Sequence, residues 1–396
     1  MDSIEPQIKR ILPEVVELRR ELHAHPELSR REFETARRLR QALSRLPNLT
    51  VLPPLLETDV VAVLNPDRAG PCIALRADLD ALPIDEATNV PYKSKVAGVM
   101  HACGHDGHTA ILLGTAMILS QSADSLPGKV KFIFQPDEED RGGGGELCRR
   151  GVLDAPKVNA AVALHAWPYQ PLGAIVVRRG SIMAASTTFA VTIRGQGAHG
   201  AYPHRGIDPI VVAAHVITAL QTIVSRNVAP QDAAVVTVGQ VSAGSATNII
   251  PPECTMRGTL RYVRPETGEL VRQRLSTVAG HTARAHGAEA AIEFSPGYPP
   301  MVNDPDLARF VETVGRGVLG PQQVVTDEPI SMGVEDFAFY AQQVPSVMFR
   351  LGLRPPGAES YPSLHSPQFD FNDDALPVGI RLFREIAARF LAAQTP

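Results

Sequence analysis

The sequence predicts an α/β protein with a mostly parallel central sheet and an inserted, ferredoxin-like α+β domain. Two observations lead to this prediction. Strand and helix patterns alternate through residues 1–183 and 297–396, which is typical of a parallel sheet covered by helices. Between residues 184 and 296 the patterns follow the order β-α-β-β-α-β, which is the ferredoxin-like arrangement. We therefore expect a discontinuous first domain, residues 1–183 and 297–396, with residues 184–296 inserted into it.

The first segment contains most of the elements expected for the main sheet. Apolar positions spaced by three and four residues predict a helix over residues 8–45. Apolar runs predict buried strands at "VVAVLN", "CIALRADLDALPI" and "KVKFIFQP", the last of which ends at Pro136. A further helix is expected from about Thr109 to Ser120, and "AAVALHAWP" is expected to be a strand that ends near His165.

Strand and helix patterns also define the rest of the chain. The strands expected in the inserted domain are "TTFAVTIRG", "AAVVTVGQV", "TMRGTLRY" and "AEAAIEF". Its expected helices are "DPIVVAAHVITALQTIVSR" and "PETGELVRQRLSTVAGHTARAHG". The first domain resumes with the helix "DPDLARFVETVGRGVL", the strand "SVMFRLGL" and the closing helix "DDALPVGIRLFREIAARFLAAQ".

Composition and charge place the chain among ordinary globular proteins. Its 396 residues are 44% hydrophobic and 20% charged, with a net charge of −4 and no basic block, so we expect no nucleic-acid partner. No apolar run approaches the ~18 residues of a membrane span, and the polar N-terminus has no signal-peptide pattern. The four scattered cysteines favour free thiols, so we expect a cytoplasmic protein that is not bound to a membrane.

Polar residues follow several of the predicted strands, where ligands gather in open α/β sheets. The stretch "MHACGHDGHTA" puts three histidines, one cysteine and one aspartate in front of an apolar helix. The other polar residues at this edge are Asp78 and Asp80 after one strand, Glu138 and Glu139 after the next, and His165 at the end of a third. Because four separate stretches point to the same edge, the sequence predicts one site there.

The residue types of this site indicate metal chemistry. Thiolate and imidazole suit zinc, and carboxylates suit harder ions such as manganese, so a mixed set can hold a pair of divalent cations. In "PDEED" one glutamate can bind metal while its neighbour acts as a general base on water. His101 and His108 are expected to flank the loop or contact substrate. Asp137 and Asp140 are expected to be solvated.

Other motifs receive structural interpretations. His23 and His25 are expected to be structural residues near a helix end, and His215, His281 and His286 structural residues of predicted helices. "GQGAHG" matches a dinucleotide-binding pattern, but no helix follows it directly and no acid lies about 20 residues on. "GGGG" lacks the following lysine of a phosphate-binding loop, and we expect it to form a tight turn.

Nine stretches, in order along nearly the whole chain, resemble the metal-dependent aminoacylase and carboxypeptidase superfamily. The similarity is greatest to the branch of hippurate hydrolases, N-acyl-amino-acid amidohydrolases and auxin-conjugate hydrolases. The stretches are "RRELHAHPELSRREFET", "IALRADLDALPI", "MHACGHDGHTAILLG", "FQPDEE", "LHAWP", "GQGAHGAYPH", "ATNIIPP", "EDFAFY" and "LHSPQFDFNDDAL".

The resemblance implies a role for each matching residue. The metal ligands it implies are Cys103, His105, Glu139, His165 and His365. Glu138 is implied as the general base and Asp80 as an aspartate just behind the ligands, although Asp78 stands where relatives have a further metal-binding histidine. In the inserted domain His199 and Asn248 are implied to reach the substrate. Arg261 is expected to bind the substrate carboxylate, and Arg257 is the alternative residue for this role.

The function implied is hydrolysis of N-acyl or N-aroyl amino acids by two divalent cations per subunit, with zinc, manganese, nickel and cobalt not distinguished. The inserted domain is implied to be a lid that forms a homodimer or higher oligomer, and in dimeric relatives the partner supplies His199. Asp137 and Val334 depart from the usual family residues, which leaves the substrate range open. The alternatives are a dipeptidase or carboxypeptidase with the same machinery and a metal-stabilised binding protein without turnover.

Overall fold

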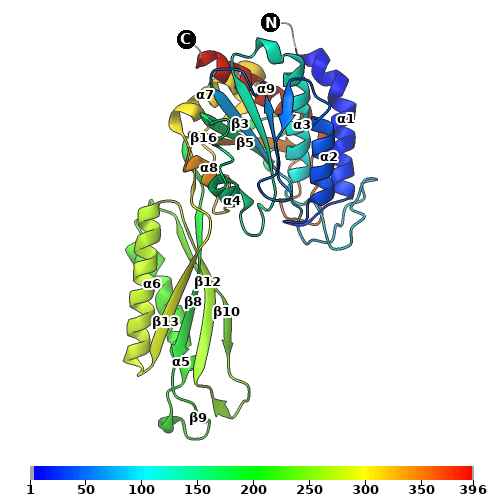
Figure 1. Ribbon diagram of the computed structural model, residues 1–396. Helices are drawn as coiled ribbons and strands as arrows, with labels where there is room; N and C mark the ends of the chain where they lie inside the picture. The colour runs from blue at the N-terminus through cyan, green and yellow to red at the C-terminus, as the bar shows by residue number, and fades with distance from the viewer. Residues whose placement is uncertain (1–3, 395–396) are drawn as a thin grey trace. The chain divides into compact units, whose positions relative to one another are not determined.

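The computed structural model describes residues 4–394, which divide into two compact units (Figure 1). The first unit holds the chain through Gly180, then Val302–Pro329 and the residues from Asp336 onward, and the second holds Ser181–Met301 and Ile330–Glu335. The inserted unit was predicted over residues 184–296 alone. The short segment around Ser331 joins it because the Ser331 N–H donates to the Ile182 carbonyl at 3.0 Å.

An eight-stranded sheet forms the centre of the first unit, and its strand order is β1-β2-β4-β3-β5-β16-β6-β15. The strands are β1 (Leu49–Val51), β2 (Val60–Leu64), β3 (Cys72–Asp78), β4 (Lys129–Gln135), β5 (Ala160–Pro171), β6 (Ile175–Val176), β15 (Val324–Val325) and β16 (Ser346–Arg354). The central strands β4, β3, β5 and β16 run parallel to one another. Every residue of β2 and β3 is buried, as their unbroken apolar runs predict.

The helices of the first unit are α1 (Glu5–Ala24), α2 (Phe33–Leu43), α3 (His105–Gln121), α4 (Gly143–Arg149), α7 (Pro305–Leu319), α8 (Ala338–Ala341) and α9 (Leu376–Ala393). In Figure 1 helices α1, α2 and α3 lie side by side along the sheet, and α3 packs on both α1 and α9. Short 3-10 turns lie at Ala123–Ser125, Pro321–Gln323 and Asp373–Ala375 in this unit and at Pro203–Arg205 in the second unit.

Two predicted helix boundaries in this unit were wrong. The single helix predicted over residues 8–45 is two helices, because His25 precedes Pro26 and has left the helical conformation, with φ −130° and ψ 59°. A proline disfavours the helical conformation for the residue before it, although Leu12 keeps that conformation before Pro13 within α1. Helix α3 begins at His105, four residues before the predicted Thr109, because Gly104 adopts φ +91° and turns the chain into the helix.

The second unit is an antiparallel sheet of strand order β10-β12-β8-β13 with two helices. Its elements are β8 (Ala185–Arg194), α5 (Pro209–Asn227), β10 (Ala234–Ala243), β12 (Glu253–Tyr262), α6 (Pro265–Ala285) and β13 (Glu289–Pro296). They follow the predicted β-α-β-β-α-β order. The two-residue strands β9 (Ala198–His199) and β11 (Ile249–Ile250) pair with each other. Strands β7 (Gly180–Met183) and β14 (Met301–Asn303) lie where the chain passes between the units.

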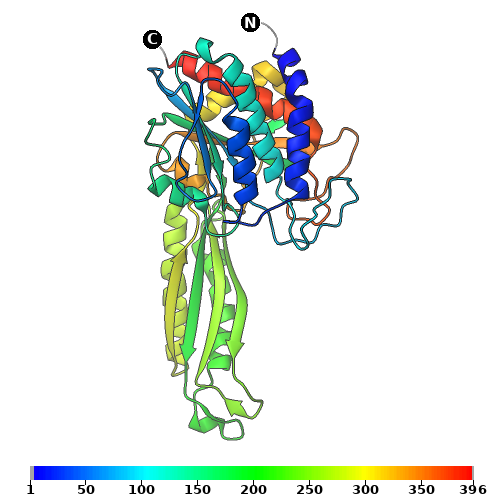
Figure 2. The same ribbon diagram turned by 45° about the vertical axis from the view of Figure 1, so that its right-hand side comes forward.

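Helix α5 is the one helix among the described residues that is long and apolar enough to cross a membrane, judged by length and composition. The strands of the second unit are seen from a second direction in Figure 2. Val212, Val216 and Leu220 of α5 are buried in the hydrophobic core of this unit, together with Met256 and Leu275. These contacts are those of a helix in a folded domain.

Candidate metal centre

Side chains from four separate parts of the first unit meet near the carboxyl ends of β3 and β4. His165 joins them from within β5, which continues to Pro171 and does not end near His165 as predicted. Cys103, His105 and His165 place one ligand atom each within 4.8 Å of one another. The same holds for Cys103, Glu139 and His365, and for His105, Glu138 and Glu139. Because these three groups share members, the five predicted ligands and Glu138 form one continuous cluster.

The turn between Cys103 and His105 requires a glycine. Gly104 has φ +91°, and a Cβ on it would lie 2.9 Å from the Ala166 Cβ. A side chain there would therefore strain the backbone and clash with β5. With glycine in place, Cys103 ends the loop, and His105 begins α3 two residues later.

Hydrogen bonds turn two imidazoles so that each presents Nε2 to the cluster. The Nδ1 of His105 lies 2.8 Å from the Asp80 carbonyl oxygen and donates to it, since that oxygen can only accept. The Nδ1 of His165 donates in the same way to the Ala166 carbonyl at 2.8 Å. The Nε2 of His105 is buried and has no hydrogen-bond partner among residues 4–394, and the Nε2 of His165 lies 3.5 Å from the Cys103 Sγ. Metal-binding histidines are held in this manner.

Glu139 and His365 complete the cluster on its other side. The Glu139 Oε1 lies 3.1 Å from the His365 Nε2 and 3.9 Å from the His105 Nε2. The Glu139 backbone N–H donates to the Asp80 Oδ2 at 3.0 Å, so Asp80 contacts two of the cluster residues without entering the triads. The His365 N–H donates to the Ala102 carbonyl at 2.8 Å, which ties its loop to the residue before Cys103.

The electrostatics of the cluster call for a cation. Burial, with Glu139 and Glu138 nearby, raises the pKa of the Cys103 thiol well above its usual value. Burial would lower the pKa of His105, but Asp78 and Asp80 outweigh it and raise that pKa to about 10. Two glutamates, a buried thiol and an unpartnered imidazole nitrogen suit a divalent cation, which would neutralise the carboxylates and stabilise the thiolate. The residues present therefore fit a metal of the zinc or manganese class.

His108 is not available as a ligand, although it lies within the cluster. Its Nδ1 is 2.6 Å from the Asp78 Oδ1, and its Nε2 accepts the Ala166 N–H at 2.7 Å. Both ring nitrogens are therefore used to hold β5 beside β3. His101 is buried, and burial lowers its pKa to about 4, so it is neutral near pH 7.

The prediction that Asp137 is solvated was wrong. Its side chain is 1% exposed and pairs with the guanidinium of Arg30, and its backbone takes φ +61°. The Asp137 carbonyl accepts the N–H groups of Gly142 and Gly143 at 3.1 and 2.7 Å. The acidic loop, residues 136–142, therefore closes on itself before α4. Of the glycine run, Gly142 makes the turn and the other three begin the helix. Asp140 is exposed as predicted.

Two buried networks support the site and were not anticipated from the sequence. The first is centred on Asp106 and the second on Asp336. His23 Nδ1 lies 2.8 Å from the Oδ2 of Asp106, the residue after His105. Burial opposes the charge on His23, but Asp106 and Glu86 raise its pKa to about 9. The buried guanidinium of Arg19 lies 3.0 Å from Asp106 and also pairs with Asp370, which follows His365 by five residues. These ion pairs tie the start of α3 to the His365 loop.

Asp336 organises the opposite side of the acidic loop. Its carboxylate accepts from the Arg76 Nη2 at 2.7 Å and from the Gly144 N–H at 2.7 Å. It also accepts from the Gln135 side chain at 2.8 and 2.7 Å. The presence of Asp336 in the motif "EDFAFY" was the only sequence signal for this arrangement.

The second unit brings two of its predicted residues together. His199 in β9 pairs with Ile249 in β11, and the neighbouring Gly200 N–H donates to the Asn248 carbonyl at 2.8 Å. His199 is exposed, and its Nδ1 accepts the Ala201 N–H at 3.1 Å, which leaves Nε2 as the N–H donor.

The two arginines of β12 differ in their surroundings. Arg261 is partly buried, and its Nη1 is buried with no hydrogen-bond partner among the residues described. Burial lowers the pKa of this guanidinium. Arg257 lies four residues earlier in the same strand and is exposed. A buried guanidinium N–H without a partner favours Arg261 as the group that receives an anionic ligand.

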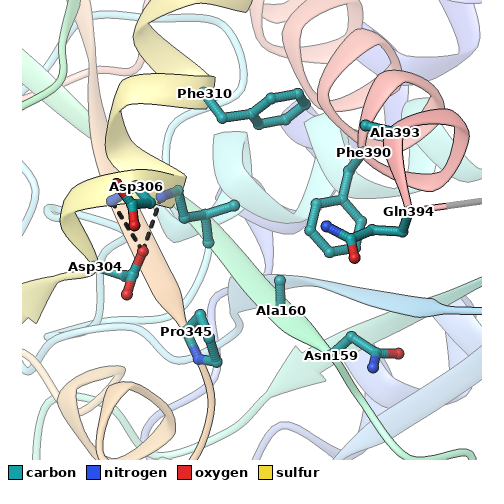
Figure 3. A pocket seen from close by; sticks show the side chains of 10 residues that line it. Asn159, Ala160, Asp304, Asp306, Phe310, Pro345, Phe390, Ala393 and Gln394 are labelled. Carbon is teal, nitrogen blue, oxygen red and sulfur yellow. Dashed lines mark hydrogen bonds between the residues drawn. The ribbon is translucent and has the colours of Figure 1, made fainter.

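A separate cavity of about 390 Å³ lies at the amino end of β5 (Figure 3). It is lined by Asn159, Ala160, Asp304, Asp306, Leu307, Phe310, Pro345, Phe390, Ala393 and Gln394. None of these residues belongs to the candidate metal-binding cluster, which lies near the carboxyl ends of β3 and β4. The Asp304 carboxylate instead caps α7 by accepting from the Asp306 and Leu307 N–H groups.

Comparisons with known proteins identify the relatives of this chain. Residues 74–389 match the family model described as Peptidase family M20/M25/M40. The chain is 40% identical to an N-acetylcysteine deacetylase of Bacillus subtilis, covering 94% of this chain and 96% of that protein. It is 38% identical to the Arabidopsis thaliana protein IAA-amino acid hydrolase ILR1-like 4, covering 95% of this chain and 86% of that protein. Its fold matches that of Bacillus subtilis YXEP, a dinuclear metal-binding peptidase, with TM-score 0.84, 37% identity and coverage of 97% and 99%.

Proposed function

The chain belongs to peptidase family M20/M25/M40 and is a hydrolase of amide bonds, and we propose that its substrates are N-acyl or N-aroyl amino acids. The products would be a carboxylic acid and a free amino acid. The observation that carries the proposal is the set of three overlapping ligand triads with Glu138 inside it. The names of the similar deacetylase and IAA-amino acid hydrolase support the same substrate class.

We propose that two divalent cations are held by Cys103, His105, Glu139, His165 and His365. When bound, such cations would polarise the scissile carbonyl and lower the pKa of a water molecule at the site. The mixed thiolate, imidazole and carboxylate donors suit zinc, manganese, nickel or cobalt.

Glu138 is the proposed general base. It is buried beside the ligands, and its carboxylate lies within 4.8 Å of ligand atoms of His105 and Glu139. In this position it takes a proton from the attacking water and then delivers a proton to the leaving amine. Glu139 uses its own carboxylate as a ligand, so the two adjacent glutamates have separate tasks.

We propose that the second unit, the inserted domain, is a lid that also forms a homodimer in the cytoplasm. Arg261 is the proposed clamp for the substrate carboxylate, because a guanidinium binds a carboxylate through two N–H groups. His199 and Asn248 are proposed to contact the substrate, with His199 donating to the oxyanion through Nε2. The cysteines in the described residues are all free and buried, which suits a reducing compartment.

Replacing His199 with alanine should lower kcat by about 10²–10³-fold, the usual cost of losing one oxyanion donor. Metal content should stay unchanged, because His199 is not one of the proposed ligands. If His199 acts across a dimer, mixing His199→Ala protomers with Glu138→Gln protomers should restore activity. One site of the mixed dimer would then have both intact residues. No recovery after verified subunit exchange would exclude the crossed arrangement, and a wild-type rate for His199→Ala would exclude a catalytic role.

A substrate panel tests the proposed function directly. Purified protein reconstituted with each of the four metals should hydrolyse N-acetyl, N-benzoyl and N-indoleacetyl amino acids, with release of the free amino acid as the readout. Matched dipeptides with a free α-amino group should be poorer substrates. A preference for the dipeptides would reassign the chain as a dipeptidase. Ligand binding without hydrolysis in metal-loaded protein would identify a binding protein.

A further inference from the structure

The loop that carries Glu138 and Glu139 is held by the turn between α1 and α2. In this turn Arg30 extends its guanidinium to two acids of the loop region. Its Nε donates to the Asp137 Oδ2 at 2.5 Å, and its Nη2 donates to the Glu146 Oε2 at 2.9 Å. The Asp137 side chain is buried, and the Arg30 side chain is 45% exposed. The Arg30 guanidinium thus links Asp137, the residue before Glu138, to Glu146 in α4 through two ion pairs.

The backbone of Asp137 is held by the same turn. Its N–H donates to the Glu32 Oε1 at 3.0 Å, and that oxygen also accepts the Arg30 N–H at 3.0 Å. The Asp137 Oδ1 accepts the Arg141 N–H at 3.1 Å, so the side chain closes the loop locally as well. These contacts stabilise φ +61°, a left-handed conformation that residues other than glycine adopt less readily.

The other neighbour of Glu138 is tied to this turn through one intermediate. The Ser29 hydroxyl donates to the Asp80 Oδ2 at 2.7 Å, and the same oxygen accepts the Glu139 N–H at 3.0 Å. The residues on both sides of Glu138 are therefore anchored to residues 29–32. Anchoring both flanking residues restricts the direction in which the Glu138 side chain leaves the backbone.

We propose that Arg30 is a positioning residue, which sets the orientation of the general base by holding Asp137 in its left-handed conformation. The inference rests on the function proposed above. Arg30 acts on Glu138 through its ion pair with Asp137. A misplacement of about 1 Å by a remote substitution can cost about 10²-fold in rate. The turn at residues 29–32 therefore contributes to the catalytic rate. Because this turn lies far in sequence from every proposed metal ligand, the sequence alone does not indicate that contribution.

Arg30→Ala is the first test. It should lower kcat by about 10–10²-fold and leave KM within about threefold, because the substrate contacts are untouched. Titration of the metal-free variant with Mn²⁺ should give the wild-type stoichiometry. Arg30→Lys should recover part of the lost kcat, since an ammonium can pair with Asp137 but cannot span to Glu146 as a fork. An unchanged kcat for Arg30→Ala, or equal losses in Arg30→Ala and Arg30→Lys, would overturn the proposal.

Substitutions of Asp137 separate the ion pair from the backbone conformation. Asp137→Gly keeps access to φ +61° but removes the carboxylate, whereas Asp137→Ala removes the carboxylate and adds steric strain. Both should lose kcat, and Asp137→Ala should also melt at a lower temperature. The double variant Arg30→Ala, Asp137→Gly should lose no more kcat than the larger single loss, because the two residues act as one unit. Additive losses would show that Arg30 works without Asp137 and would contradict the proposal.

Two neighbouring residues provide matched controls. Arg31 is the exposed arginine next to Arg30, and Asp140 is an exposed acid of the same loop. Arg31→Ala and Asp140→Asn should keep the wild-type kcat and KM. A comparable loss in Arg31→Ala would mean that any basic residue of this turn matters, and the specific assignment to Arg30 would be wrong.

Hydrogen exchange separates this inference from the proposed function. In Arg30→Ala the amides of Gly142 and Gly143, which donate to the Asp137 carbonyl, should exchange faster than in the wild type. Exchange in the strands of the second unit should not change. Wild-type protein without activity on any N-acyl amino acid would refute the function, while the exchange result would still test the contact. Active wild-type protein with unaltered loop exchange and kcat in Arg30→Ala would refute the positioning role alone.

Discussion

Replacing Glu138 with glutamine is expected to lower kcat by about 10²–10⁴-fold while both metal ions remain bound. The substitution keeps the size of the side chain but removes the group that accepts and returns a proton, and this is the usual contribution of general acid–base catalysis. The metals remain because the proposed ligands are other residues. Steady-state kinetics on an N-acyl amino acid, together with elemental analysis of the same sample, measures both quantities.

Glu139→Gln is the matched comparison, because it makes the same chemical change one residue along. The Glu139 Oε1 faces His365 and His105, so the amide variant should lose metal as well as activity. Added metal should restore more activity to Glu139→Gln than to Glu138→Gln. If both variants kept their metal and Glu139→Gln alone were inactive, the two roles would have to be exchanged.

Removing divalent cations with a chelator is expected to abolish hydrolysis, and adding zinc, manganese, nickel or cobalt should restore it. Burial and two glutamates raise the pKa of Cys103 in the absence of a cation, so the metal-free site has no thiolate and lacks the cations that would polarise the amide. Activity and metal content should be followed together during chelation and reconstitution. Full activity in protein shown to be metal-free would refute the mechanism.

Cys103→Ser tests whether the thiol is one of the ligands. A hydroxyl is a harder and weaker donor than a thiolate, so the affinity for zinc should fall relative to that for manganese. His108→Gln is not a neutral control, because His108 holds β5 beside β3 through Asp78 and Ala166. The exposed Asp140→Asn is a better reference. Identical zinc affinity and stoichiometry in Cys103→Ser and the wild type would show that Cys103 is not a ligand.

Much of the fold could be predicted because each element carries its own local pattern. The buried strand "CIALRAD" was located from its apolar run and the strand "TTFAVTIRG" from its own local pattern, and both signals lie within the segment itself. The errors occurred where the outcome depends on a contact outside the segment or on a single residue. Ser331 joins the second unit through a backbone contact with Ile182, and no pattern within residues 330–335 indicates such a contact.

The candidate site was predictable in its residue types and only partly in its arrangement. Asp137 was misjudged because an acid in a polar loop is usually exposed, and its partner Arg30 lies 107 positions earlier in the chain. His365 lies in a loop with no periodicity, so only its place within a longer motif marked it. Neither residue has a local signal, because the interaction that defines each one is made with a distant segment.

The sequence by itself determined the α/β class, the inserted β-α-β-β-α-β unit and the thiol, imidazole and carboxylate groups available to bind metal. These features follow from side-chain chemistry and from periodicities of two and 3.6 residues, which act over short distances. Only the tertiary structure decided three features of the site. His105 presents its Nε2 to the cluster, His108 uses both ring nitrogens in other hydrogen bonds, and Arg30 binds Asp137 in the acidic loop. Each of these outcomes depends on a hydrogen bond between segments 25 to 107 residues apart, and folding alone brings such segments together.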